Sequence, residues 1–185
     1  NLDYNLWSEN ISYFDGLGRE IQKISVKASG YGNDLVQPII YDDFGRIKKT
    51  FLPYAISQSG TNGPGGYRSN PLTELRGFYS NYYGDDDGRY AFSDKEFDGS
   101  PLNRIKKQSS PGYAWKLEGG KIKEFTYETN TNNEVPKYEV NNNGELVKND
   151  FYPENAFYKN SIIDEEQNKA TQYKNAIGQV ILIFL

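Results

Sequence analysis

Carboxylates are the main candidates for chemistry in this chain, because its 185 residues include 25 Asp and Glu but no His and no Cys. That composition removes the usual zinc ligands, the Ser-His and Cys-His nucleophile pairs, and the commonest general base near neutral pH. Paired acids such as Glu165 with Glu166, or Asp94 with Glu96, could carry out glycoside hydrolysis, which needs two carboxyl groups facing each other across a cleft. With so many acids such pairs arise by chance, so we expect no enzymatic activity and no cofactor.

The run Asp85-Asp86-Asp87-Gly88 is a candidate calcium loop, because clustered carboxylates supply the oxygen ligands that calcium prefers. In EF-hand spacing Asp85 and Asp87 would be two of the three early ligands. Tyr83, however, stands at the first ligand position and Asp94 at the last. The sequence therefore favours the alternative interpretation, an acidic type I turn without a metal.

Two tryptophans, Trp7 and Trp115, and 16 tyrosines could stack on sugar rings. Aromatic side chains in β-proteins more often form the core and cross-strand pairs. Trp115 follows Pro111-Gly112-Tyr113, and we expect it to fill the core. A carbohydrate-binding module that uses exposed Tyr and Trp to bind a glycan is the alternative function for this chain.

Charge and hydropathy exclude two classes of partner. The net charge is −4 and no basic stripe is present, whereas phosphate-backbone binding needs a surface of Lys and Arg, so no nucleic acid is expected. No apolar run approaches the roughly 18 residues that span a bilayer. The run Val180 to Leu185 is expected to be a covered strand. The chain has no Met and opens without a signal peptide, as expected of a mature or excised segment.

One short phrase recurs six times, with Asp, Asn or Ser at its first position and Gly or Asn three residues later. This is the requirement of a type I turn whose fourth residue has a positive φ, the loop of a hairpin with a G1 bulge. An Arg follows several of these turns, and we expect it to brace the hairpin through hydrogen bonds or ion pairs with neighbouring acids. The first, fourth and Arg positions are Asp15, Gly18 and Arg19; Asp42, Gly45 and Arg46; Asp85 and Gly88; Ser100, Asn103 and Arg104; Asn141 and Gly144; Asn175 and Gly178.

The segments between the turns indicate strands, because apolar and polar residues alternate in runs such as 21–26, 47–51 and 121–127. The sequence predicts a single all-β domain over 1–185, made of antiparallel sheets of consecutive β-hairpins with little helix. The best helical candidate is 161–174. A glycine-rich polar stretch predicts a flexible loop over 56–70.

The phrase Tyr-Asp-x-x-Gly-Arg, at Tyr41 to Arg46, is the core of the YD repeats in Rhs-type proteins, large bacterial shell proteins built of β-hairpins. The chain resembles a domain of unknown function near the N-terminus of some secreted bacterial Rhs/YD-repeat proteins, ahead of the repeat array. The resemblance runs over most of the chain. It is carried by Phe14 to Arg19, Ile40 to Arg46 with Leu52-Pro53-Tyr54, Phe97, Ser100 to Arg104, Pro111-Gly112 and Trp115.

The resemblance implies a non-enzymatic structural or interaction module, secreted or at the cell surface, that starts or caps a β-hairpin shell. Its partners would be downstream YD repeats or another protein of the same shell, paired through open sheet edges. Two features depart from the family pattern. Glu145 and Gln179 replace the Arg after two turns, and the chain ends at Leu185 where the family continues into further repeats, as a truncated segment would.

Overall fold

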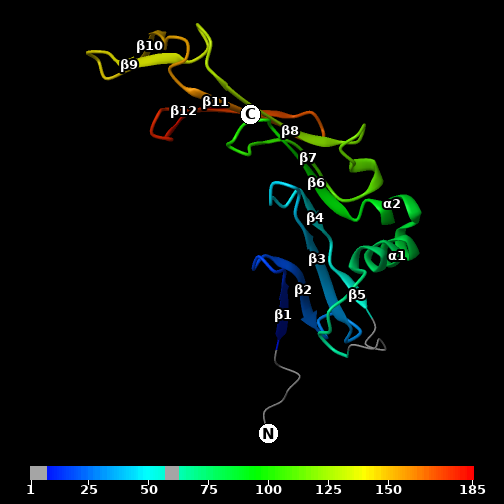
Figure 1. Ribbon diagram of the computed structural model, residues 1–185. Helices are drawn as coiled ribbons and strands as arrows, with labels where there is room; N and C mark the ends of the chain where they lie inside the picture. Colours follow the sequence, from blue (N-terminus) through cyan, green and yellow to red (C-terminus); the bar gives the residue numbers. More distant parts are fainter. Residues whose placement is uncertain (1–7, 57–62) are drawn as a thin grey trace. The chain divides into compact units, whose positions relative to one another are not determined.

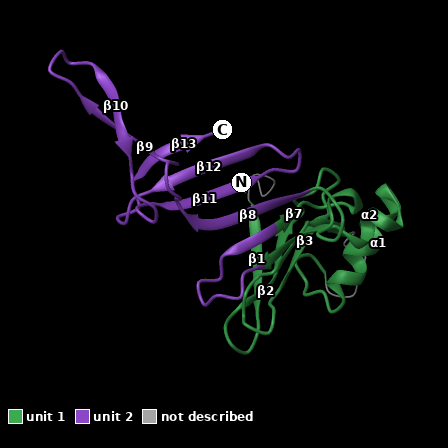
Figure 2. Cartoon of the chain, turned by 90° about the horizontal axis from the view of Figure 1, so that it is seen from above, with its two compact units in different colours: residues 1–96, 108–121 green, residues 97–107, 122–185 purple. Residues whose placement is uncertain are grey.

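The computed structural model describes residues 8–56 and 63–185 and is mostly antiparallel β-sheet with two short helices, as the sequence predicts (Figure 1). The chain forms two compact units, residues 1–96 with 108–121 and residues 97–107 with 122–185 (Figure 2). The elements in chain order are β1 (Glu9–Phe14), β2 (Glu20–Val26), β3 (Asp34–Ile40), β4 (Lys49–Phe51), β5 (Tyr54–Ile56), α1 (Pro71–Tyr83), α2 (Asp85–Arg89), β6 (Phe92–Phe97), β7 (Ile105–Ser109), the 3-10 helix η2 (Tyr113–Trp115), β8 (Ile122–Thr129), β9 (Pro136–Val140), β10 (Leu146–Phe151), β11 (Tyr158–Ile163), β12 (Lys169–Lys174) and β13 (Val180–Phe184).

The first unit is built on an antiparallel sheet in the order β1–β2–β3–β4–β6, with β5 also paired with β3. Ile24 of β2 and Val36 of β3 lie opposite each other and are fully buried. Successive side chains of a strand point to opposite faces, so this pair marks the face of the sheet that is covered. Phe51 of β4 and Tyr54 of β5 are buried in the same core.

Helix α1 packs against β3 and β5 and places Leu75 in the core of the first unit. Pro71 stands at its start and Glu74 in its first turn, both favourable positions at a helix N-terminus. The best helical candidate, 161–174, is not a helix: these residues form the end of β11, a turn and β12, and their side chains alternate with period two across the sheet. No helix in the described part of the chain is long and apolar enough to span a membrane.

The predicted flexible loop over 56–70 lies partly outside the described residues, and its second half is attached to the sheet. Buried Gln22 exchanges two hydrogen bonds with the backbone of Arg68, at 3.1 and 2.9 Å. Gly65 N donates to Oδ2 of buried Asp34 at 2.6 Å. These two polar side chains would be costly to bury alone, and the loop supplies their partners.

The second unit is an antiparallel sheet in which β8, β11, β12 and β13 lie side by side. The strands β9 and β10 form a separate two-stranded hairpin, which projects from that sheet (Figure 2). Val135, Phe157 and Tyr173 form a second core, against which Tyr152 and Leu182 pack.

Candidate functional site

Two hairpin turns of the first unit hold an Asp and an Arg in the same arrangement. Asp15 Oδ1 accepts hydrogen bonds from Leu17 N and Arg19 N at 2.9 Å, and Oδ2 accepts from Arg19 Nε at 2.8 Å. Asp42 and Arg46 repeat these contacts at 2.9 and 2.8 Å. We call a side-chain hydrogen bond between the first and fifth residues of a turn a turn clasp.

The turn clasps have an electrostatic consequence for the two aspartates. The Arg backbone N–H, together with the guanidinium, holds the pKa of Asp15 and of Asp42 below its usual value in spite of desolvation. The guanidinium of Arg19 also lies 4.6 Å from the ring centre of Tyr41, beside the next turn. Each Arg therefore acts as a brace of the hairpins, the role that the sequence predicts for it.

The fourth residue of these turns has the left-handed conformation that the sequence pattern requires. Gly18 and Gly45 both have φ of 75°, Gly144 has 81° and Gly178 has 84°. Asn103 has φ of 52° although it carries a side chain. The agreement covers five of the six blocks, and in each of the five the next strand begins directly or within a few residues after the turn.

The two turns that lack Arg keep a turn clasp with the donor and acceptor exchanged. Asn141 Nδ2 donates to Glu145 Oε2 at 3.0 Å, and Asn175 Nδ2 donates to Gln179 Oε1 at 2.9 Å. An Asn at the first position offers an N–H that an Asp lacks, so the fifth residue must supply an acceptor instead of a cation. The departure of Glu145 and Gln179 from the Arg pattern is therefore a paired change.

Sequence reasoning missed further turns of this kind. One is Ser29 to Asn33, where Gly32 has φ of 70° and Ser29 Oγ accepts from Asn33 N. Another lies between β11 and β12 and has a turn clasp between side chains. Asn168 Nδ2 donates to Asp164 Oδ2 at 2.9 Å, and Gln167 has φ of 70°. The glutamine at the fourth position hides the pattern, because Gly and Asn are the residues expected there. The Asp and Asn four residues apart were the available signal.

The turn containing Ser100 and Asn103 uses an acid from outside the turn. Arg104 Nε donates to Asp98 Oδ2 at 2.8 Å, and Asp98 supplies the negative charge that the serine at the first position lacks. Ser100 itself donates its hydroxyl to Asp98 at 2.8 Å. The Ser100 hydroxyl and the Arg104 guanidinium hold the pKa of Asp98 below its usual value, against desolvation.

The predicted turn at Asp85 to Gly88 is wrong, because these residues form helix α2. Gly88 is buried against α1, where a Cβ would lie 2.7 Å from Ser80 N, so a close helix contact requires this glycine. Asp87 Oδ1 accepts from Tyr113 N at 2.8 Å. Across the described residues, no three His, Cys, Asp or Glu side chains are grouped closely enough to hold a metal ion.

One acid of each possible hydrolase pair has a lysine partner. Asp94 Oδ2 lies 3.9 Å from Lys49 Nζ, and Glu165 Oε1 lies 3.5 Å from Lys123 Nζ. The two ion pairs belong to different units. Asp94 and Glu165 therefore each balance the charge of a neighbouring lysine on their sheet.

Of the two tryptophans, Trp7 lies outside the described residues, whereas Trp115 contributes to a groove in the first unit. Trp115 is half-buried and borders the groove instead of filling the core. The groove has a volume of about 570 Å³. Its walls are formed by Leu52, Tyr79, Tyr83, Asp87, Ala91, Pro111, Gly112, Ala114 and Trp115.

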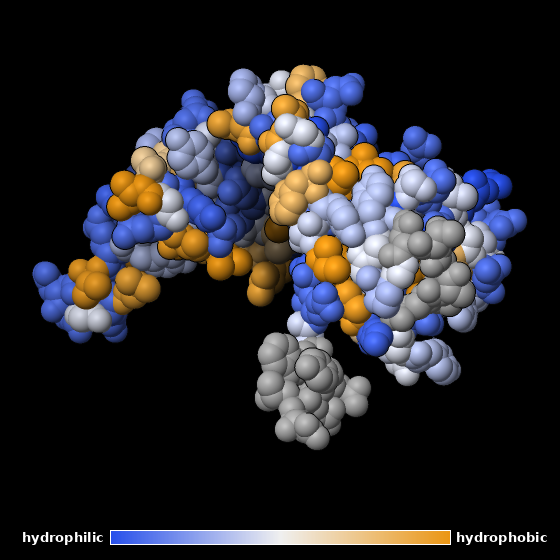
Figure 3. Space-filling view, turned by 60° about the horizontal axis from the view of Figure 1, so that its bottom comes forward, coloured by the Kyte–Doolittle hydropathy of each residue, from blue (hydrophilic) through white to orange (hydrophobic). Residues whose placement is uncertain are grey.

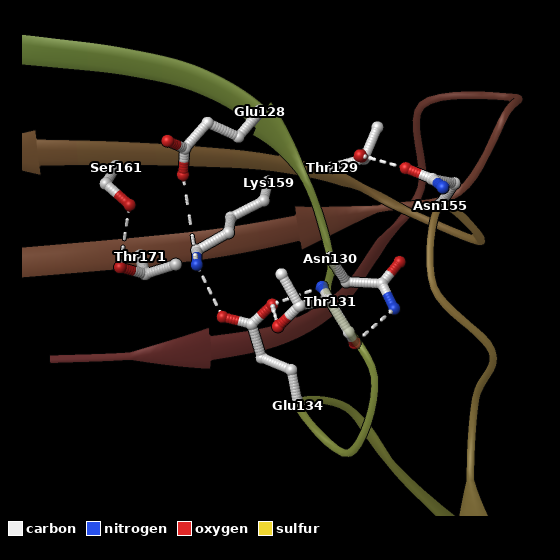
Figure 4. A network of polar contacts seen from close by, with 9 residues as sticks. All are labelled: Glu128, Thr129, Asn130, Thr131, Glu134, Asn155, Lys159, Ser161 and Thr171. Carbon is white, nitrogen blue, oxygen red and sulfur yellow. Dashed lines mark hydrogen bonds and ion pairs between the residues drawn. The ribbon is translucent and has the colours of Figure 1, made fainter.

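The second unit contains a dense set of polar contacts that includes Asn130 and Lys159 (Figure 4). Asn130 is almost fully buried; its Oδ1 accepts from Phe157 N at 2.8 Å and its Nδ2 donates to Pro153 O at 2.8 Å. Its backbone carbonyl accepts from Asn155 N at 2.8 Å. These contacts tie together the loops on both sides of the β9–β10 hairpin.

Next to Asn130, Lys159 of β11 points toward Glu134 and Glu128 (Figure 4). Lys159 forms an ion pair with Glu134 and lies 3.9 Å from Glu128 Oε2. Burial raises the pKa of Glu134, but the Lys159 ammonium and the Thr131 N–H outweigh it and bring the pKa to about 2. Burial and Glu134 together raise the pKa of Tyr173 to about 12. The arrangement keeps Glu134 ionised, which suits a structural ion pair.

The strand β13 forms an open edge of the second unit's sheet. Among the described residues it pairs only with β12. Its sequence is Val-Ile-Leu-Ile-Phe, and four of its five side chains are exposed. On the face shown in Figure 3, hydrophobic residues reach the surface in separate patches. A strand edge of this composition offers both unpaired backbone groups and apolar side chains.

A protein-family model described as a domain of unknown function (DUF6443) matches residues 1–129. The chain belongs to this family. The DUF6443 match includes the aromatic groove and ends at the last residue of β8. It also includes the three hairpin turns in which an Arg bonds an Asp, at Arg19, Arg46 and Arg104. The turns whose clasps contain no Arg begin at Asn141, Asp164 and Asn175 and lie beyond the matched residues. A comparison with curated proteins finds no match.

Proposed function

We propose that this chain is a non-enzymatic structural module of an Rhs/YD-repeat-type protein, secreted or at the cell surface, which starts or caps a shell of β-hairpins. In this role β13 pairs with the first strand of the next hairpin. The observation that carries the proposal is the open edge of β13, with four exposed apolar side chains and no charge.

An edge strand of this kind is a template for another strand, and proteins normally blunt such edges with charge, proline or a bulge. β13 contains no charged residue and no proline, and its pairing with β12 shifts register once, at the turn end between Tyr173 and Lys174. β1, which pairs only with β2 among the described residues, is more polar and begins Glu9-Asn10. The contrast supports β13 as the edge that another strand covers.

The turn clasps give a second line of support. Five turns hold their first and fifth side chains together, so each hairpin fixes its own register without help from a distant segment. A row of such hairpins can continue by adding one more strand pair at its edge. That is the architecture expected of a hairpin shell.

The test uses the 185-residue chain with a second copy of itself as the probe for edge pairing. Light scattering coupled to size-exclusion chromatography over a range of concentrations should show association that Ile183→Lys weakens by about tenfold or more, since a lysine on an edge strand opposes pairing. Ile162→Lys is the matched control, because Ile162 is exposed to a similar extent (43% against 51%) but lies on the interior strand β11.

Association that both variants retain, or that both lose equally, would contradict pairing through β13. A wild-type chain that stays monomeric at every concentration would also remove the basis of the proposal. Circular dichroism of both variants checks that the sheet is intact.

A further inference from the structure

The groove of the first unit has one flat aromatic wall. Tyr79 and Tyr83 stand four residues apart on α1, so they share one face of the helix. Their rings are nearly parallel, with an interplanar angle of 22° and centroids 6.1 Å apart. The Tyr79 hydroxyl donates to Pro53 O at 2.7 Å, which fixes the orientation of the inner ring.

The other wall is shaped by a glycine that leaves room for two functional side chains. Gly112 has φ of 112°, and a Cβ at this position would lie 3.2 Å from Trp115 Cδ1 and 3.5 Å from Asp87 Oδ1. The indole and the carboxylate therefore approach each other across a residue that has no side chain. An aromatic surface with a carboxylate at its border results.

One carboxylate lines the groove, and two lysines lie beside aromatic residues that form its wall or lie next to it. Asp87 Oδ1 is held by Tyr113 N, whereas Asp87 Oδ2 makes no hydrogen bond within the described part of the chain. Lys121 Nζ lies 5.6 Å from the Trp115 ring centre, and Lys116 Nζ lies 3.8 Å from that of Tyr113. Asp87 lines the groove and the two lysines lie next to its wall, so neither sign of charge dominates, and the groove favours an uncharged ligand that can both donate and accept hydrogen bonds.

We propose that this groove binds an uncharged saccharide. The apolar C–H face of a pyranose packs on Tyr83 and Trp115, and a sugar hydroxyl donates to Asp87 Oδ2. The volume of about 570 Å³ lies within the range of roughly 300–1,000 Å³ typical of small-ligand sites. This inference does not rest on the shell role, because the groove lies in the first unit and β13 in the second.

A proline-rich peptide is the main competing ligand, because such peptides also bind aromatic grooves. Proline has no backbone N–H, so a proline-rich segment presents mostly carbonyl acceptors. Asp87 would then face acceptors and lose the donor it needs. A saccharide supplies hydroxyl donors at that position, and the carboxylate therefore favours the sugar.

The test screens the full chain against immobilised uncharged oligosaccharides, namely glucans, mannans, galactans and β-linked N-acetylglucosamine oligomers. The best-bound one is then titrated by calorimetry. Tyr83→Ala should weaken binding by roughly tenfold or more, since it removes an aromatic platform. Tyr82→Ala is the matched control: it is the adjacent tyrosine on α1, equally exposed (70% against 67%), but it does not border the groove.

The proposal is supported if Tyr82→Ala binds within about threefold of the wild type while Tyr83→Ala binds about tenfold more weakly. The tenfold change corresponds to about 1.4 kcal/mol of binding free energy. Three results would overturn it: binding to none of the oligosaccharides, binding that Tyr83→Ala leaves unchanged, or binding only to a proline decamer tested in parallel. Loss of association in the β13 experiment would leave this result untouched, so the two proposals fail separately.

Discussion

Replacing Gly88 by Ala should destabilise the first unit, although helix propensity alone predicts the opposite sign. An alanine in a helix interior is favoured over glycine by about 1 kcal/mol. On Gly88, however, the added Cβ would lie 2.7 Å from Ser80 N and 2.9 Å from Ser80 Cα. These are backbone atoms of α1, so the two helices must separate, and such overpacking costs roughly 1–3 kcal/mol. Taking the upper end because backbone has to move, we expect a net loss of about 2 kcal/mol.

Gly77→Ala provides the matched control. Gly77 also lies in α1, but a Cβ there would meet no atom within 4 Å, so this variant should gain about 1 kcal/mol. Urea unfolding followed by tryptophan fluorescence reports on this region, because both tryptophans lie within residues 1–115. The difference between the two variants should be about 3 kcal/mol. A Gly88→Ala protein as stable as the wild type would refute the close contact between α1 and α2.

Two further predictions concern turns and charge. Gly45→Val should destabilise the chain by about 1–2 kcal/mol because a β-branched residue tolerates φ of 75° poorly, while Asn103→Gly should be neutral or mildly stabilising. The midpoints of urea unfolding measure both effects. A Gly45→Val protein as stable as the wild type would contradict the turn assignment. The pKa of Glu134 is about 2 when folded, below its usual 4.5, so the folded state binds fewer protons and the stability from Glu134 is present above about pH 4.5 and lost as the pH falls toward 2. Glu134→Gln should flatten this part of the pH–stability curve, and an unchanged curve would show that Glu134 does not cause it.

The hairpin turns could be predicted from sequence because their requirements are local. Asp42 and Gly45 lie three residues apart, and a short carboxylate followed by a residue that tolerates positive φ defines the turn without reference to the rest of the chain. Ser100 and Asn103 meet the same requirement at the first and fourth turn positions with different residue types. The all-β architecture followed from the same local signals.

The failures came where tertiary contacts decide the conformation. The residues Asp85 to Gly88 match the sequence pattern of a turn, but this segment forms helix α2, in which Gly88 packs against Ser80 of α1. The start of α1 did carry local signals, Pro71 and Glu74, although the weak periodicity of the segment obscured them. Likewise, no spacing rule could bring Asp87 beside Gly112, because 25 residues separate them in the chain.

The partners of buried polar side chains were also beyond local reasoning. Asn130 has the sequence features of an ordinary loop asparagine, yet it is buried and bonded to its neighbour Thr131 and to Pro153 and Phe157 in the loop between β10 and β11. Gln22 and Asp34 lie on strands and are satisfied by a loop more than 30 residues away. Such residues become recognisable only when the packing of the loops over the sheet is known.

The turn clasps also bear on how a gene for such a chain can change. Each clasp is encoded within five consecutive codons, as in Asp15 to Arg19 or Asn175 to Gln179. Duplication of a hairpin therefore copies the turn clasp together with the turn that it stabilises, and no compensating change is needed elsewhere. A clasp can also pass from Asp–Arg to an uncharged Asn–Gln pair by changes at two nearby positions. Hairpin number and surface charge can thus evolve separately from each other.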